Sequence, residues 1–289
     1  MGGGSGLDRA RRLGPDQTTK ELALARVRGR GGAGFPAARK WAGVRDQPGT
    51  RRYVVCNAAE GEPATFKDRA IIRANPYQVI EGLAIASVTM EAHEVYIGVK
   101  GSFHLEIERL SRAVAEMQEA GLAGDAPFTI VAGPDEYLFG EEKALLEVIE
   151  GKPPLPRLLS PFEHGLFATG PQVGWEPTPR MAGSRERDLS NPTLVNNVET
   201  LATVAHVLAR GSEWHRSMGT EESPGHLVVT VVGDVIAPDV AEVVMGTPLG
   251  EAISTIGGGV EPGRIIKAVF SGIANPVIIG SQLDTPLSY

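Results

Sequence analysis

The order of short apolar segments and helical segments constrains the fold of this chain most strongly. Three runs predict strands: a short apolar run at residues 53–56 that suits a buried parallel strand, an alternating run at residues 94–99, and a third run at residues 128–131. The segments between them show the 3.6-residue spacing of helices. Strands that alternate with helices in this way indicate βαβ units and a parallel, Rossmann-like sheet. A ligand of such a sheet lies beyond the carboxyl ends of the strands, which here are followed by residues 57–62, 100–101 and 133–137.

The composition is ordinary for a globular protein, but it argues against several functions. The chain has 289 residues and a formal net charge of -7, which disfavours nucleic-acid binding because phosphate contacts need a basic face. No run of about 18 apolar residues predicts a transmembrane helix. The first residues lack the apolar stretch of a signal peptide. We therefore expect a cytoplasmic protein that meets a membrane only through a partner.

A glycine-rich stretch at residues 28–41 is the first candidate binding element. Gly29, Gly31 and Gly34 fit the spacing G-x-G-x-x-G, but a helix precedes them and no acidic residue follows about 20 positions later, as a dinucleotide fingerprint requires. Two interpretations stay open. The loop is either a phosphate cradle with Arg30 and Lys40 beside it, or a glycine-rich surface turn with solvated arginines.

Two further segments carry polar residues at expected helix starts. Residues 137–142 open a helix, and Glu141 and Glu142 either favour its dipole or bind ribose hydroxyls or an amide. Asn196 and Asn197 open another helix, which runs to about residue 210. They either meet a phosphate or a flavin edge, or one of them only caps the helix.

The chain is expected to contain a peripheral lead (1–19), a ligand-binding domain (20–225) and a small α+β unit (226–289). The last begins where the hydrophobic period changes from 3.6 to 2, and its pattern predicts a hairpin, a helix and a further strand. The chain has one cysteine, Cys56, at the end of an apolar strand, so we expect a buried thiol and no Cys₄ iron–sulfur cluster within these residues. The six histidines show no metal-ligand spacing, and no motif of a hydrolase or phosphoryl transferase occurs.

Four motifs together resemble the flavin-binding, NADH-oxidising subunit of respiratory complex I and of related hydrogenases and formate dehydrogenases. They are GRGGAGFP at 29–36, VCNAAEGEPATFKDR at 55–69, YLFGEEKALL at 137–146 and PTLVNNVET at 192–200. The similarity extends from about residue 20 to residue 289. It implies an FMN domain followed by an SLBB domain, which is a ubiquitin-like β-grasp module.

The resemblance implies FMN and NAD(H) as cofactors, and NADH and iron–sulfur electron-transfer subunits as partners. The residues implied to hold or line the flavin are Gly31, Gly32, Lys40, Asn57, Glu60, Tyr137, Gly140, Glu141, Asn196, Asn197 and Thr200. Phe35, Glu62 and Glu142 are implied on the NADH side, and Gly29, Arg30, Gly34 and Val195 complete the expected cofactor-binding set. No catalytic side chain and no metal ligand are expected, because hydride transfer is the chemistry of the cofactors.

Three departures from the family pattern bear on this expectation. Ala59 stands where the family has an aspartate, and Leu159 stands where it has a lysine that helps to hold the dinucleotide. The cysteines of the family's C-terminal [4Fe–4S] domain do not occur in this chain. Two functions therefore remain: a hydride-accepting flavoprotein with an external electron acceptor, and a non-catalytic nucleotide-binding or assembly subunit.

Overall fold

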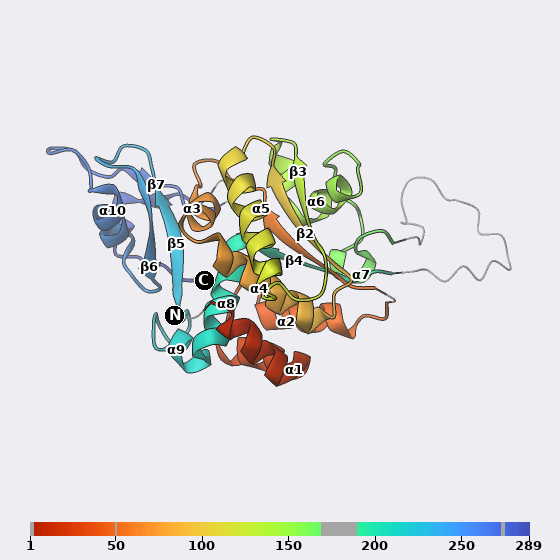
Figure 1. Cartoon of the computed structure of the whole chain (residues 1–289). Helices are drawn as coiled ribbons and strands as arrows, with labels where there is room; N and C mark the ends of the chain where they lie inside the picture. The colour runs from red at the N-terminus through yellow and green to blue at the C-terminus, as the bar shows by residue number, and fades with distance from the viewer. Residues whose placement is uncertain (1–2, 50, 169–189, 273–274) are drawn as a thin grey trace.

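A four-stranded parallel sheet forms the centre of the first unit (Figure 1). The computed structural model describes residues 3–49, 51–168, 190–272 and 275–289. The strands of this sheet are β1 (Tyr53–Ala58), β2 (Glu94–Lys100), β3 (Phe128–Gly133) and β4 (Thr193–Asn197), in the spatial order β3-β2-β1-β4. The α/β fold and the three strands expected from the sequence are confirmed.

Strand β4 is a correction to the sequence interpretation, which takes residues 195–197 as the start of a helix. Leu194 and Val195 are buried, and the backbone pairs with β1, so that Cys56 lies beside Asn196 and Asn57 beside Asn197. Helix α8 (Val198–Arg210) begins only after this strand. The pairing with β1 decides the conformation here, because it joins residues about 140 positions apart that local spacing does not relate.

Helices cover both faces of the sheet, and the larger core lies on one of them. That core takes its side chains from the strands and from six of the described helices. These helices are α1 (Ser5–Leu24), α2 (Ala37–Asp46), α3 (Lys67–Ala74), α4 (Pro76–Met90), α5 (His104–Glu119) and α8. The other face is covered by η1 (Tyr137–Gly140), α6 (Glu142–Ile149) and the short α7 (Pro161–His164).

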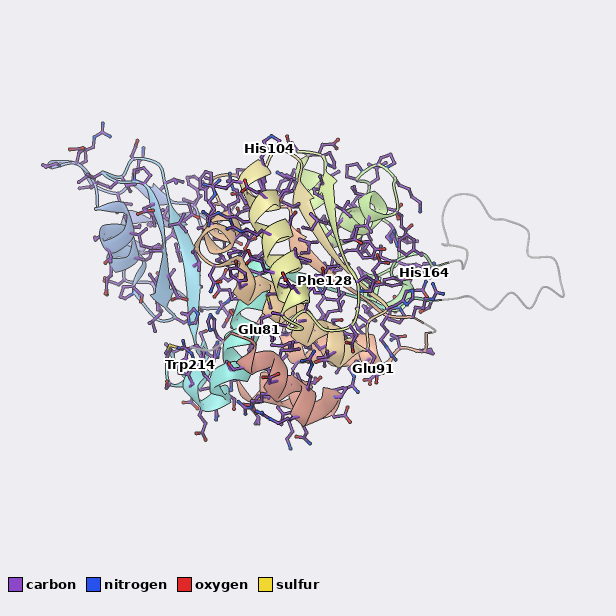
Figure 2. All side chains as sticks on the ribbon, in the orientation of Figure 1. Glu81, Glu91, His104, Phe128, His164 and Trp214 are labelled. Atoms are coloured by element: carbon purple, nitrogen blue, oxygen red, sulfur yellow. The ribbon has the colours of Figure 1, made fainter. Side chains whose placement is uncertain are left out.

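The N-terminal segment differs from the peripheral lead expected for residues 1–19. It forms α1, and Leu7 and Leu22 of this helix are fully buried against α4 and α8. The carboxylate of Glu81 in α4 accepts hydrogen bonds from the N–H groups of Gly6 at 2.8 Å and Leu7 at 3.2 Å (Figure 2). These N–H groups have no partner within the helix, so a side chain from another helix satisfies them. Local composition, rich in glycine and charge, gives no sign of this contact.

The second unit consists of two small antiparallel pairs and one helix. Its elements are β5 (His226–Val231), β6 (Asp239–Val244), α10 (Leu249–Gly257), β7 (Ala268–Val269), β8 (Ile278–Ile279) and η2 (Gly280–Gln282). The expected order of hairpin, helix and strand is present, and Ile253 and Ile256 of α10 contribute to a separate apolar core. This unit lies beside α3 and near α9 (Ser212–Arg216) (Figure 1). Trp214 of α9, labelled in Figure 2, packs against the ring of His226 with ring centres 6.3 Å apart.

Candidate functional site

The glycine-rich stretch folds as a tight hairpin whose tip contacts α8. The N–H of Gly29 donates to the carbonyl of Phe35 at 2.8 Å, which closes the hairpin. The N–H of Arg30 donates to Oγ1 of Thr200 at 2.9 Å. Gly32 has a φ of 112°, a conformation that side chains rarely adopt. A Cβ built on Gly31 would lie 3.7 Å from the Cβ of Asn197, so the hairpin tip faces the end of β4.

The tip of this hairpin has the backbone geometry of an anion-binding loop. Residues 30–33 form a turn, and within the described residues the N–H groups of residues 31–34 make no hydrogen bond of good distance and angle. No atom lies within 4 Å of the position that a Cβ would take on Gly32. Open N–H groups without a side chain in front of them are the arrangement that suits a phosphate. These observations favour the cradle over the plain surface turn.

An ion pair between Lys40 and Glu142 joins α2, the helix that follows the hairpin, to α6. The Nζ atom of Lys40 lies 2.5 Å from Oε2 of Glu142, and both side chains are partly exposed. The resemblance assigns Lys40 to the flavin and Glu142 to the dinucleotide. The structure instead pairs the two with each other, so a ligand that takes either one must share or break this ion pair.

The loop after β1 meets the segment before α6. The Nδ2 atom of Asn57 donates to the carbonyl of Gly140 at 2.7 Å. The hydroxyl of Tyr137 donates to Oε2 of Glu62 at 3.2 Å, and this hydrogen bond raises the pKa of Tyr137. A Cβ on Gly61 would lie 3.0 Å from the carbonyl oxygen of Tyr137. Two motifs about 80 residues apart are therefore adjacent, as the resemblance requires.

Glu60 makes structural contacts within the chain, whether or not it also binds a ligand. Its carboxylate is buried and accepts from the N–H of Asp68 at 2.8 Å and from Nε of Arg69 at 3.1 Å. It therefore caps the start of α3. Burial, together with the charge of Asp68, raises the pKa of Glu60 above its usual range.

Glu141 and Asn197 both cap helices, which is the alternative to ligand binding that the sequence analysis gives for these positions. Glu141 accepts from the N–H groups of Lys143 and Ala144, both at 2.9 Å, at the start of α6. Asn197 accepts from the N–H of Glu199 at 3.0 Å at the start of α8. Capping occupies one oxygen in each case, and the amide nitrogen of Asn197 is also engaged, because it donates to Oδ2 of Asp68 at 2.6 Å.

Besides Glu60 and Arg30, three further expected site residues have their side chains inside the fold. Val195 belongs to the apolar cluster behind the sheet. Asn196 is 5 % exposed, and its Oδ1 accepts from the indole N–H of Trp41 at 2.8 Å. Thr200 is fully buried under Arg30. Only backbone atoms of Val195 and Asn196 are therefore offered toward the carboxyl edge of β4.

Phe35 and Tyr137 are the exposed rings of this region. Phe35 is 48 % exposed and Tyr137 57 % exposed, although both are large apolar side chains. The guanidinium of Arg39 lies 5.6 Å from the centre of the Phe35 ring. Exposed aromatic rings beside open backbone N–H groups suit a ligand with a flat ring system.

A buried charge cluster under the hairpin was not predicted from the sequence. The Nζ atom of Lys67 lies 2.7 Å from Oδ1 of Asp68 and 3.0 Å from Oε2 of Glu199. Burial opposes the charge of Lys67, but the two carboxylates outweigh it and raise its pKa. The Nδ2 atom of Asn197 donates to Oδ2 of Asp68 at 2.6 Å. The available signal was a charged residue, Glu199, at the start of an otherwise apolar helix.

Ala59 has a methyl group at the position where the family has an aspartate carboxylate. Its side chain is fully buried and packs with Val55, Phe139 and other apolar residues behind the sheet. The aspartate expected from the family would place a charge in this apolar cluster or turn out of it. At this position the chain therefore offers a ligand only backbone atoms.

The four motifs thus meet at the carboxyl ends of β1 and β4. The hollow in the surface of this region lies elsewhere. A hollow of about 330 Å³ lies at the base of the hairpin, among Arg28, Pro36, Arg39 and the end of α1, and no predicted site residue lines it. The predicted residues form an open edge of the sheet rather than this hollow, and the convergence of the four motifs identifies that edge as the candidate site.

Among the described residues, no group of three or more His, Cys, Asp or Glu side chains is placed to hold a metal. None of the described helices has the length and apolar character needed to cross a bilayer.

Comparisons with known proteins point to one family. Residues 22–206 match the model described as the Nuo51 FMN-binding domain. An NADH-quinone oxidoreductase subunit of Rhizobium meliloti is 38% identical over 284 residues, which are 95% of this chain and 63% of that protein. The alpha subunit of the NAD-reducing hydrogenase HoxS of Cupriavidus necator is 35% identical over 260 residues, which are 87% of this chain and 40% of that protein.

A solved structure shares the fold over the whole chain. The crystal structure of an NAD+-reducing [NiFe]-hydrogenase in the H2-reduced state superposes with a TM-score of 0.82 at 30% identity. The match covers 100% of this chain and 47% of that one. The present chain therefore spans between about two fifths and two thirds of the length of these relatives.

Proposed function

This chain belongs to the Nuo51 FMN-binding domain family, and from this premise we propose that it binds FMN and accepts a hydride from NADH. The convergence of the glycine hairpin with the ends of β1 and β4 carries the proposal. Gly31 faces Asn197, and Asn57 contacts Gly140. Four motifs that are far apart in the sequence meet at one edge of the sheet, where α/β proteins bind their ligands.

The residues of this edge fit a flavin mononucleotide. The open N–H groups of residues 31–34 and the ammonium of Lys40 suit its phosphate. The exposed rings of Phe35 and Tyr137 suit the dinucleotide. Asn57 and Asn197 border the same edge, and their amide groups are held by Gly140 and Asp68. When bound, the flavin supplies the hydride-accepting chemistry, and these residues orient it and exclude water.

The electron acceptor lies outside the residues of this chain in our proposal. The chain has a single cysteine, and Cys56 is buried with a raised pKa because of that burial. The relatives are named as subunits of larger enzymes, which supports one or more partner subunits. We propose an iron–sulfur centre on another chain, or on a domain that the relatives have beyond the matched part, as the acceptor.

Flavin reduction under anaerobic conditions tests this function. Purified protein is reconstituted with FMN and then mixed with NADH under argon. We expect a bound flavin spectrum that NADH bleaches, and NADH-dependent reduction of ferricyanide that needs FMN. Tight FMN binding without bleaching would instead support the non-catalytic subunit, an alternative that the named relatives do not favour.

A further inference from the structure

A buried carboxylate, Glu199, joins the glycine hairpin to the second unit of the chain. Its Oε1 accepts from the N–H of Val228 in β5 at 2.9 Å and lies 3.8 Å from Nε of Arg30 in the hairpin. Its Oε2 lies 3.0 Å from Nζ of Lys67 at the start of α3. The Glu199 side chain is 5 % exposed and that of Arg30 6 % exposed. One side chain of α8 therefore contacts three segments that are far apart in the sequence.

Arg30 is held at both its backbone and its side chain. Its N–H donates to Thr200, and its guanidinium donates through Nη2 to the carbonyl of His226 in β5. The same guanidinium lies 4.8 Å from the centre of the Tyr289 ring. Gly31 and Gly32 follow directly, and their N–H groups are the ones offered to the phosphate. The position of Arg30 thus sets where these N–H groups point.

One buried nitrogen in this cluster has an unsatisfied hydrogen bond. Among the described residues, Nε of Arg30 has no hydrogen-bond partner, because Glu199 lies slightly too far away at 3.8 Å. A buried donor without a partner is unfavourable. Movement of the hairpin by less than about one ångström toward α8 would complete the bond, given ordinary hydrogen-bond lengths.

We propose that Glu199 is a positioning residue that couples ligand binding at the glycine hairpin to the docking of the second unit. This inference rests on the proposed function, since the ligand is FMN. In this proposal Glu199 acts through Arg30 and β5 rather than through a contact of its own with the ligand. Coupling of this kind is reciprocal: FMN strengthens the contact between hairpin and β5, and that contact strengthens FMN binding by the same factor.

The test uses the full chain and four variants. Glu199→Gln keeps an acceptor for Val228 but loses the charge that faces Arg30 and Lys67. Arg30→Met keeps much of the side-chain length without the guanidinium, and the double variant completes a cycle. Glu106→Gln is the matched control, because Glu106 is a buried carboxylate whose Oε1 lies 2.5 Å from Nε of Arg73 in α3, away from the hairpin.

Two measurements are made on each folded variant: FMN affinity by titration of flavin fluorescence, and hydrogen exchange of residues 28–35 and 226–231 with and without FMN. We expect FMN binding to weaken by about tenfold in Glu199→Gln, within the range typical of coupling between sites. The double variant should bind about as weakly as Arg30→Met alone. FMN should slow exchange in residues 226–231 of the original chain and of Glu106→Gln, but not of Glu199→Gln.

The outcomes separate this inference from the proposed function. If the original chain binds FMN and Glu199→Gln binds it equally well, or if the two single effects add, the coupling is refuted and the function stands. If the original chain binds no FMN, the proposed function fails. In that case exchange in the ligand-free protein still decides on the contact: faster exchange at both segments in Glu199→Gln supports it, and unchanged exchange refutes it.

Discussion

At the scale of single residues, the side chain of His215 in α9 is fully buried. Its Nδ1 lies 2.9 Å from the carbonyl of Ala25, which makes Nδ1 the donor. Gly225 packs directly against Nε2, and among the described residues this nitrogen has no hydrogen-bond partner. Burial, which the charges of His226 and Arg30 reinforce, lowers the pKa of His215 to about 4. The neutral ring is therefore the folded form.

This pKa predicts a loss of stability in acid. The unfolded chain takes up the proton near the ordinary pKa of about 6.5, whereas the folded chain does so only near 4, so the free energy of unfolding falls between these values. We expect a loss of roughly 3 kcal/mol from this residue at pH 4. Denaturant unfolding at pH 7, 5.5 and 4.5 should show a flatter dependence for His215→Gln. Parallel curves for the two proteins would contradict the assignment.

The ion pair between Lys40 and Glu142 leads to a second prediction. In Glu142→Gln the ammonium is released for the flavin phosphate, so FMN should bind as well as before or up to about fivefold more tightly, as the modest energy of a partly exposed pair allows. The KM for NADH should rise, because the resemblance puts this carboxylate on the dinucleotide side. Lys40→Ala should weaken FMN binding most at low salt.

The matched control for this pair is Glu136→Gln, which removes an exposed acid just before η1. It should alter neither FMN affinity nor the KM for NADH. Equal loss of FMN and NADH binding in Glu142→Gln would show that the glutamate serves the flavin instead.

At the scale of elements, the contact between α4 and α8 depends on a glycine. A Cβ on Gly82 would collide with the backbone carbonyl of Leu201 in α8, which cannot turn aside as a flexible side chain does. Gly82→Ala should therefore lower the free energy of unfolding by about 1–3 kcal/mol, despite the better helix propensity of alanine. The measurement is denaturant unfolding at neutral pH.

Gly43 in α2 provides the comparison for this substitution. Nothing lies within 4 Å of the position of its Cβ, and its φ is not in the left-handed region. Gly43→Ala should raise the free energy of unfolding by up to about 1 kcal/mol. If both variants shifted in the same direction, helix propensity rather than close packing would govern these positions.

The elements also show how far the sequence could predict the fold and the site. Strands β1, β2 and β3 and helix α4 follow from the local spacing of apolar residues, and β1, β2 and α4 are buried over most of their length. Strand β4 does not, since it is defined by its pairing with β1. The burial of α1 depends on packing against α4 and α8, and Glu81, which caps its start, is about 75 residues away. The glycine hairpin is recognisable in the sequence as a motif. The cluster of Glu199, Lys67 and Arg30 is not, because it forms only when three separate segments of the chain come together in the fold.

At the scale of the whole molecule, the second unit is more than an appended module. It touches the first unit through the hydrogen bond between Val228 and Glu199 and through the bond from the N–H of Phe66 to Oγ1 of Thr230, at 3.0 Å. Glu199 and Phe66, which make these contacts, belong to two of the four motifs that form the candidate flavin site. The chain covers only part of each relative's length, so in our proposal this pair of units is the portion that receives the hydride.

The position of β4 next to β1 also has a consequence for the order of assembly during synthesis. β1 leaves the ribosome early, yet its neighbour on one side is made only after residue 192. Loop closure over such a distance is slow compared with the formation of local contacts. A nascent chain that ends before β4 therefore carries the glycine hairpin without Asn197 and Thr200 opposite it. In our proposal, the flavin site is therefore complete only once the chain extends through residue 200.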